Sequence, residues 1–328
     1  MVPLFLAAQI GSATLSVTPE DFGCVSGDEK EALNNSAKLQ KMVEYAERNG
    51  MKIISGANKR YYISQSIQIR MPLTIDFNRA ILVATDTIDM IVISRGNKNN
   101  KLYAGKISGL YLDMNKKAKS GLYCRNVVKL RVNDCWVFNV SASGCGVAVK
   151  KGGEMFFDNI HIEGGENNAC GIRIETHDCH FSDCVMINCH VAVDNNGSNF
   201  FERVHAWMEN GRWIPGGTFF KIRSSGPIFL HQCFSDTFDR AFDIESKTKL
   251  FITQFKNFHN RNMWKWREVN NIKPEIFHFK TQNIADNSYI TLDNSYIGSL
   301  VFEGKNYQKF SNLNDQQVKM YHTLTELE

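Results

Sequence analysis

The feature of this chain that most constrains its fold is a repeat between residues 128 and 258. Six eight-residue segments can be superposed, and each has an apolar second residue, two polar residues, another apolar residue and then alternating residues. The segments begin at Arg131, Phe156, His180, Phe200, Phe229 and Phe251. Successive copies start 20 to 29 residues apart, which is the period of the coils in a stacked solenoid.

A second, shorter segment recurs between these copies. It is an apolar run that ends on a charged residue, found at residues 146–150, 171–175, 191–194, 219–223 and 242–245. Period-two alternation and β-branched or aromatic residues indicate strands, and no leucine-rich pattern is present. The sequence therefore predicts an all-β fold, a right-handed parallel β-helix in which each coil buries its apolar face against its neighbours.

Length and composition are consistent with one large elongated domain, because the chain has 328 residues, 43% hydrophobic and 22% charged. We predict an N-terminal segment with a capping helix over residues 1–65, the β-helix over 66–304, and a C-terminal cap or oligomerisation tail over 305–328. The apolar residues 1–10 lack a basic region and a cleavage pattern, so we interpret them as structural rather than as a signal peptide.

The partners that the composition argues against are nucleic acids and membranes. A net charge of +4 without a long basic run does not favour nucleic acid, and no stretch is long enough to cross a bilayer. In the tail, Val318, Tyr321, Leu324 and Leu327 have a helix-like spacing.

The nine cysteines are best explained as buried thiols. Cys135, Cys184 and Cys233 occupy the inward position at which Ile160 and Val204 stand in other copies. Free cysteine packs as a small hydrophobic residue, and no CxxC pair indicates zinc. We predict neither a metal nor a cofactor.

The outward positions are where a binding site is expected. If the Cys135 column points inward, alternation turns a neighbouring column outward: Trp136, His161, Val185, His205, Phe234 and Lys256. Two residues further on, the same face carries Phe138, Glu163, Ile187, Trp207, Asp236 and Phe258. Such a face either binds a glycan, with rings stacking on sugars, or is covered by another subunit or a loop. From it we select candidate substrate-binding residues: Trp136, His161, Glu163, His205, Trp207 and Phe234.

Two carboxylates on the same or neighbouring coils would suit glycoside hydrolysis, which needs them about 5 to 9.5 Å apart. Glu209 and Asp236 meet this requirement, and Asp239 adds a third acid. The alternative is that these are turn carboxylates that accept backbone N–H groups. A second candidate column, formed by Lys150, Glu175, Asp194, Arg223 and Glu245, is typical of a surface salt-bridge ladder.

Residues 17–63 carry a family resemblance. The run Asp21-Phe22-Gly23, the helical stretch from Ala37 to Ala46 and the strand with Tyr61, Tyr62 and Ile63 resemble the cap of pectate-lyase-like β-helix proteins. The sequence departs from that pattern at Cys24, where the family often has alanine, and at residues 58–60, where it often has proline and glycine. Among these proteins, bacteriophage tailspikes are the most similar in kind. The resemblance implies a carbohydrate-active protein, a hydrolase or a lyase, that is often a homotrimer in the virion tail.

The predicted function is therefore that of a phage tailspike-like depolymerase, which hydrolyses a bacterial surface polysaccharide with an Asp/Glu pair. It would be made in the bacterial cytoplasm and act outside the cell. Two alternatives stay open. A lyase would need a base, for which His205 with Arg203 or Arg212 could serve, and a glycan-binding tail protein would need no catalytic residues.

Overall fold

The computed structural model describes residues 15–95, 101–165, 167–209, 214–246 and 248–258. It also places five later strands: β26 (Asn262–Trp266), β27 (Glu275–Thr281), β28 (Ile290–Thr291), β29 (Leu300–Glu303) and β30 (Phe310–Ser311). Beyond residue 246, side chains are described at Thr248, Leu250 and Phe255. The predicted tail helix, the Arg212 and Trp213 loop and the side chains of Lys256 and Phe258 lie outside the described residues, as do residues 1–10.

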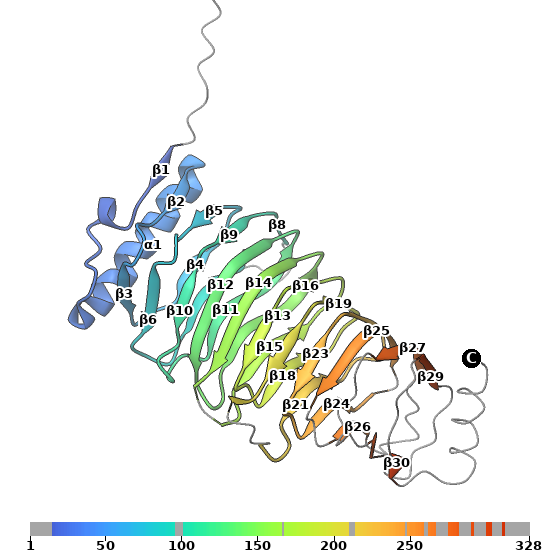
Figure 1. The fold of residues 1–328 in the computed structure, drawn as a ribbon. Helices are drawn as coiled ribbons and strands as arrows, with labels where there is room; N and C mark the ends of the chain where they lie inside the picture. Colours follow the sequence, from blue (N-terminus) through green and yellow to red (C-terminus); the bar gives the residue numbers. More distant parts are fainter. Residues whose placement is uncertain are drawn as a thin grey trace, which may run out of the picture.

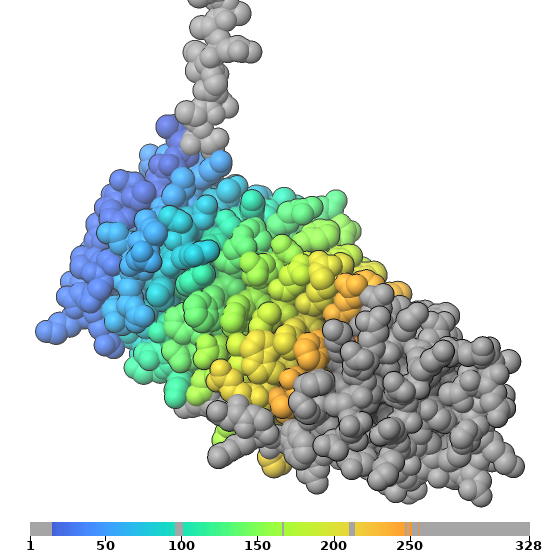
Figure 2. All heavy atoms as spheres, viewed as in Figure 1, coloured from blue at the N-terminus to red at the C-terminus, as the bar shows by residue number. Residues whose placement is uncertain are grey.

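Parallel strands stack along one axis in an 18-stranded sheet, called sheet A, and a 10-stranded sheet, called sheet B. Figure 1 shows the strands crossing the solenoid one after another, and Figure 2 shows the same order as successive colour bands on the surface. The predicted all-β parallel β-helix with an N-terminal helix is confirmed. Two strands outside these sheets, β28 and β30, pair with each other.

Each coil contributes two limbs to sheet A and one strand to sheet B. The first limb consists of β2 (Lys52–Ile54), β5 (Thr74–Asp76), β9 (Lys106–Ser108), β16 (His180–Ser182), β19 (Phe200–Glu202) and β22 (Pro227–His231). The second limb consists of β3 (Arg60–Ile63), β6 (Ile81–Ala84), β10 (Tyr111–Asp113), β17 (Val185–Ile187), β20 (His205–Trp207) and β23 (Phe234–Asp236). Three long strands run through both limbs: β12 (Arg131–Val140), β14 (Phe156–Gly164) and β25 (Lys249–Phe258).

Sheet B forms the opposite wall of the solenoid. Its strands are β4 (Ile67–Ile69), β7 (Asp89–Ile93), β11 (Ser120–Val128), β13 (Cys145–Gly153), β15 (Cys170–Glu175), β18 (Val191–Asn195), β21 (Thr218–Ile222), β24 (Arg240–Ile244) and β26. The short β1 (Ser16–Val17) pairs with β2, and β8 (Leu102–Tyr103) pairs with β11.

The two polar residues in each repeat mark a bend between the limbs. The second of them has a positive φ, between 51° and 55°, in five successive coils, at Asp134, Asn159, Asp183, Arg203 and Gln232. A left-handed residue breaks the alternation, so two consecutive side chains point outward before the next apolar one turns in. Asp and Asn tolerate this conformation best among residues with a side chain.

The interior is filled by columns of like residues. The apolar second positions pair in register from Val132 through Phe157, Phe181 and Phe201 to Leu230. The rings of Phe157, Phe181 and Phe201 stack at 4.7 and 5.4 Å. The predicted inward column at Cys135, Ile160, Cys184, Val204, Cys233 and Phe255 is buried throughout. All nine cysteines are free and buried, as predicted.

Helix α1 (Ala32–Asn49) covers the N-terminal end of the solenoid. Its buried residues include Leu39, Met42, Val43 and Ala46, the spacing of one helical face. Side chains on the same helix accept hydrogen bonds from the outermost strand, because Gln40 Oε1 lies 2.7 Å from the Gln68 N–H. The helix thereby satisfies a strand edge that would otherwise be free to pair with another chain. In the described part of the chain, no helix is apolar and long enough for a membrane span.

Candidate functional site

The outer face of sheet A carries the two columns that the sequence predicted. Strand register places Trp136 beside His161, then Val185, His205 and Phe234. The neighbouring column runs from Glu163 through Ile187 and Trp207 to Asp236. All six selected binding residues are partly buried. Five of them carry rings, so this face consists mainly of partly buried rings.

A separate row of rings lies on the first limb. Phe156, His180, Phe200 and Phe229 stack with centroids 5.0, 4.5 and 4.8 Å apart and planes within 15° of parallel. They line a groove of about 590 Å³ with His231 and Glu202. Because the faces of these rings cover one another, the row presents mainly ring edges to solvent. It is a weaker platform for a sugar, which stacks on ring faces.

The two tryptophan rings of the second limb are tilted against their neighbours instead. The Trp136 ring makes angles of 80° with Tyr111 and 37° with His161. Trp207 lies 4.6 Å from His205 at 36°, and within the described residues this is its one ring contact. A tilted indole with one ring neighbour leaves more of its face for a sugar, so Trp207 is the better platform.

His205 lies at the centre of this limb and is held in its neutral form. Its ring stacks on Phe234 at 4.3 Å, and burial lowers its pKa to about 4. Its Nε2 is buried and has no hydrogen-bond partner among the described residues. A neutral imidazole can stack, donate one hydrogen bond and accept another without adding charge to the groove.

We expect the stability of the protein to fall as pH drops from about 6.5 to 4, in part because of His205. The unfolded imidazole takes up a proton near its ordinary pKa of about 6.5, whereas the folded one resists until about pH 4, so protonation favours unfolding in that window. His205→Phe keeps the stack on Phe234 and cannot be protonated. Thermal melts from pH 7.5 to 4.5 should show a smaller decline for this variant, and parallel declines would contradict the assignment.

Glu209 and Asp236 belong to neighbouring coils of the second limb. Trp207 pairs directly with Asp236, and Glu209 follows Trp207 by two residues. The exposed carboxylate of Glu209 accepts a hydrogen bond of 2.9 Å from Asn188 Nδ2, and its N–H donates to Asn188 Oδ1 at 2.8 Å. Thr237 Oγ1 bonds both the N–H and the carbonyl of Met208, each at 2.9 Å. These contacts fix the register of the two coils beside Trp207.

Asp239 occupies a different environment. It is buried, with 7% of its surface exposed, and its carboxylate accepts the Gly216 N–H at 3.0 Å and lies 3.6 Å from Arg240 Nε. These contacts attach the turn at Gly216 to the start of β24. They correspond to the turn-carboxylate alternative and give Asp239 a structural role.

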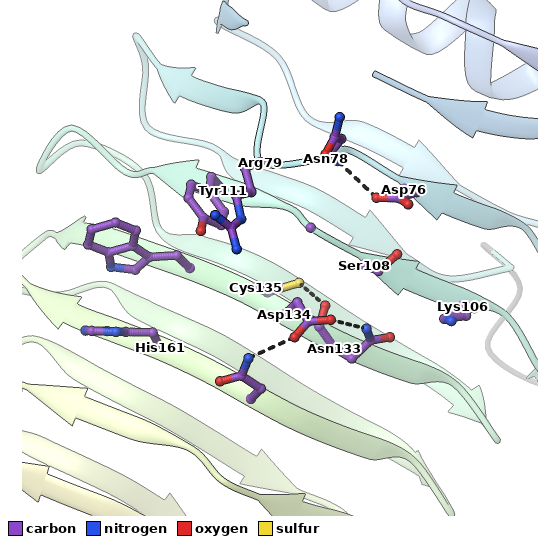
Figure 3. A pocket seen from close by; sticks show the side chains of 13 residues that line it. Asp76, Asn78, Arg79, Lys106, Ser108, Tyr111, Asn133, Asp134, Cys135 and His161 are labelled. Carbon is purple, nitrogen blue, oxygen red and sulfur yellow. Dashed lines mark hydrogen bonds between the residues drawn. The ribbon is translucent and has the colours of Figure 1, made fainter. Parts of the chain in front are cut away.

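A polar pocket of about 510 Å³ opens on sheet A toward the N-terminal end. Figure 3 shows it, with these lining residues: Asp76, Asn78, Arg79, Lys106, Ser108, Gly109, Tyr111, Asn133, Asp134, Cys135, Trp136, Asn159 and His161. Hydrogen bonds from Asn159 and Asn133, with the charges of Lys106 and Arg79, lower the pKa of Asp134. Sequence reasoning selected Trp136 and His161 but not the rest. The lining residues from Asp76 to Tyr111 lie on coils that precede the clear repeat, and Asn133, Asp134 and Asn159 are polar bend positions of the repeat itself.

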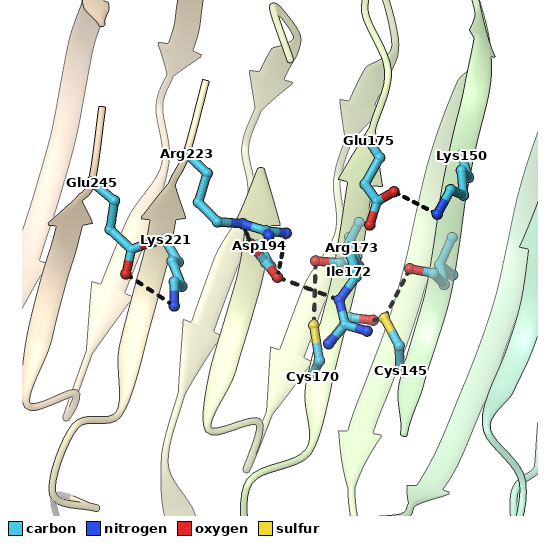
Figure 4. A network of polar contacts seen from close by, with 12 residues as sticks. Cys145, Lys150, Cys170, Ile172, Arg173, Glu175, Asp194, Lys221, Arg223 and Glu245 are labelled. Carbon is cyan, nitrogen blue, oxygen red and sulfur yellow. Dashed lines mark hydrogen bonds and ion pairs between the residues drawn. The ribbon is translucent and has the colours of Figure 1, made fainter. Parts of the chain in front are cut away.

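The charged column on sheet B is a salt-bridge ladder (Figure 4). Lys150 pairs with Glu175 at 3.1 Å, and Lys221 pairs with Glu245 at 3.2 Å. The predicted position of Asp194 in the column of Glu175 is wrong, because β18 places it beside Arg173 and Lys221. There the nearly buried carboxylate accepts hydrogen bonds from both Arg173 and Arg223. Two oppositely charged partners stabilise that register.

One arginine suggested for a lyase has other contacts. Arg203 makes two hydrogen bonds to Asp183, of 2.6 and 2.7 Å, and a further one to Glu202. Its guanidinium is therefore already bound to two carboxylates of the bend between the limbs. Arg212, the other suggested arginine, lies outside the described residues.

Comparisons with known proteins show the fold. No protein-family model matches the chain, and no curated protein does. Among solved structures, a mutant tailspike of E. coli bacteriophage HK620 in complex with a pentasaccharide is 12% identical with a TM-score of 0.53, over 84% of this chain and 66% of that one. The gp42 tailspike of Acinetobacter phage vb_AbaP_AS12 is 12% identical with a TM-score of 0.51, over 84% of this chain and 50% of that one.

The chain thus spans between half and two thirds of the length of these tailspikes. An alginate lyase from Paenibacillus sp. FPU-7 also matches, at 11% identity and a TM-score of 0.43, over 75% of this chain and 96% of that one. At such identities the likeness concerns architecture alone. The chain has the parallel β-helix fold found in phage tailspikes.

Proposed function

We propose that this protein is a tailspike-like depolymerase that binds a bacterial surface polysaccharide on the outer face of sheet A and hydrolyses it. The observation that carries the proposal is the placement of Trp207 directly beside Asp236, with Glu209 two residues further along the neighbouring coil. A sugar platform and two carboxylates then share one exposed surface. The tailspike of phage HK620, which has the same fold, was solved with a pentasaccharide.

The geometry suits glycoside hydrolysis. Neighbouring coils are about 4.8 Å apart, and two extended residues add at most about 6.6 Å. Because Glu209 lies just past the end of β20, its backbone is at most roughly 8 Å from that of Asp236. Inverting glycosidases hold their carboxyl groups about 6.5 to 9.5 Å apart, which leaves room for the attacking water. A pair on neighbouring coils that is also offset along the chain fits this wider spacing, and we therefore propose an inverting reaction.

We assign the two roles by exposure. Asp236, half-buried beside Trp207, would protonate the glycosidic oxygen of a sugar stacked on that indole. Glu209, exposed and oriented by Asn188, would take a proton from the water that attacks the anomeric carbon. The glycosidic bond breaks as the new bond to water forms, which leaves Asp236 ionised and Glu209 protonated, and proton exchange with solvent restores both.

We also propose that the protein acts as a homotrimer in a phage tail, with the first-limb row of rings as one surface that a neighbouring subunit could cover. Ring edges in a shallow apolar groove suit a protein contact better than a sugar. Sedimentation of the purified chain tests the trimer.

The test of the function is incubation of the purified chain with a panel of capsular, O-antigen and exopolysaccharides. Hydrolysis should release reducing ends without ultraviolet absorbance from unsaturated uronates. Unsaturated products would show a lyase and exclude the Glu209 and Asp236 mechanism. Binding without any new ends would show a glycan-binding tail protein.

A further inference from the structure

We infer that the polar pocket on the first coils of sheet A recognises a negatively charged sugar of the polysaccharide. The inference rests on the proposed function and specifies its substrate class. The pocket is separated from the proposed catalytic pair. Trp136 at the pocket lies four strands along the stack from Phe234, which is in the same strand as Asp236. At about 4.8 Å a step, this is roughly 19 Å, so the charged sugar would be bound several residues from the bond that is cleaved.

The first argument is the state of the cations. Arg79 and Lys106 both line the pocket and are exposed, and they lie apart from each other in it (Figure 3). Across the described residues, no carboxylate forms an ion pair with either of them. They are therefore available to an anion from outside.

The second argument is that the pocket's own carboxylates already have other donors. Asp134 accepts hydrogen bonds from Asn159 at 2.8 Å and from Asn133 at 2.6 Å. Asp76 accepts the Asn78 N–H at 3.0 Å. Amide donors thus hold the acids in place; the charges of Lys106 and Arg79 also act on Asp134, but neither cation forms an ion pair with it.

The third argument is a contrast within the molecule. On sheet B, Lys150, Arg173, Lys221 and Arg223 each have a carboxylate within 3.3 Å. On the first limb of sheet A, Arg131 pairs directly with Lys106 in the register and has no carboxylate partner among the described residues either. Arg131 instead covers the Phe156 ring at 4.7 Å. Among the described cations without an ion-pair partner, Arg79 and Lys106 are the two that line this pocket.

The remaining polar groups suit a sugar. Trp136 supplies a ring at the pocket wall, and its buried Nε1 has no hydrogen-bond partner among the described residues. A buried donor without a partner is costly, and an acceptor on a ligand would satisfy it. The shared chemistry is an anionic group on a sugar ring, either a carboxylate of an acidic sugar or a phosphate or sulfate substituent.

The experiment measures binding by affinity electrophoresis. The probes are alginate oligosaccharides and polysialic acid, each native and carboxyl-reduced, together with dextran sulfate, unsubstituted dextran and the polysaccharides of the functional panel. We expect native acidic polymers to bind more tightly than their reduced forms. Arg79→Gln and Lys106→Gln should each weaken that binding about fivefold, and the double variant about 20-fold.

Two controls separate recognition from general charge and from folding. Arg125→Gln removes one cation from the outer face of sheet B and should leave binding unchanged. Arg79→Lys keeps the charge in the same left-handed position, where φ is 65°, and should retain most of the affinity. A preference for dextran sulfate over carboxylated polymers would assign the pocket to sulfate or phosphate substituents.

Equal binding of native and reduced polymers, binding of neutral polymers alone, or an equal loss in Arg125→Gln would overturn the inference. The outcome for the proposed function is read separately, from reducing ends. If the protein cleaves a neutral polysaccharide, the proposed function is supported and the charged subsite is not. If it binds acidic sugars but cleaves no polymer, the charged subsite is supported and the hydrolase function is not.

Discussion

Replacing Asp236 with asparagine, or Glu209 with glutamine, should lower the rate of polysaccharide depolymerisation by about 10³-fold each. Each change keeps the shape of the side chain and removes its ability to give or take a proton, a step that typically contributes 10²- to 10⁴-fold. The affinity for the polymer should change little, because the rings on the second limb are untouched. Initial rates of reducing-end release at saturating polymer are the measurement.

The matched control is Glu202→Gln, which removes an exposed carboxylate from the first limb of the same coil as Trp207. It should keep the full rate. Asp239→Asn should lower the melting temperature and leave the rate of cleavage largely unchanged, because its carboxylate accepts the Gly216 N–H and faces Arg240. If Glu209→Gln and Asp236→Asn both cleave at the original rate, the catalytic groups lie elsewhere on the solenoid.

The largest effect on stability should come from Phe181→Ala. Phe181 is 1% exposed and stacks between Phe157 and Phe201 at 4.7 and 5.4 Å. Truncation leaves a cavity in the column and should lower the free energy of unfolding by about 3 to 5 kcal/mol. Urea unfolding followed by far-ultraviolet circular dichroism measures this change.

Phe200→Ala serves as the comparison. Phe200 directly precedes Phe201 but lies on the outer face of the coil, where it too stacks between two rings. It is only partly buried, so its loss should cost roughly 1 kcal/mol. Equal losses for Phe181 and Phe200 would mean that the inner and outer columns contribute alike, contrary to the burial pattern.

The sequence predicted the solenoid because burial repeats at fixed positions. Val132, Phe157, Phe181 and Phe201 must all face inward for the coils to stack, and this constraint is visible as a pattern in one chain. The helix was visible for the same reason, since Leu39, Met42, Val43 and Ala46 recur on one face.

The sequence did not reveal what the backbone does between buried positions. The left-handed residue is Asp134 in one coil, Arg203 in another and Gln232 in a third, so no single residue type marks the bend. The register of Asp194 was mispredicted because charge alone does not show which neighbours a side chain will reach. Arg79 and Lys106 were missed because a pocket depends on several coils at once, and single segments carry no sign of it.

The salt-bridge ladder on sheet B affects how the protein meets its substrate in solution. Opposite charges within a few ångströms cancel at longer range, so this wall contributes little to the electrostatic potential around the molecule. At the pocket on sheet A, by contrast, Arg79 and Lys106 have no carboxylate within ion-pair distance among the described residues. An acidic polymer that reaches the pocket would therefore meet two cations that no carboxylate of the protein pairs with. Added salt would slow this capture, with little effect on the cleavage of polymer already bound.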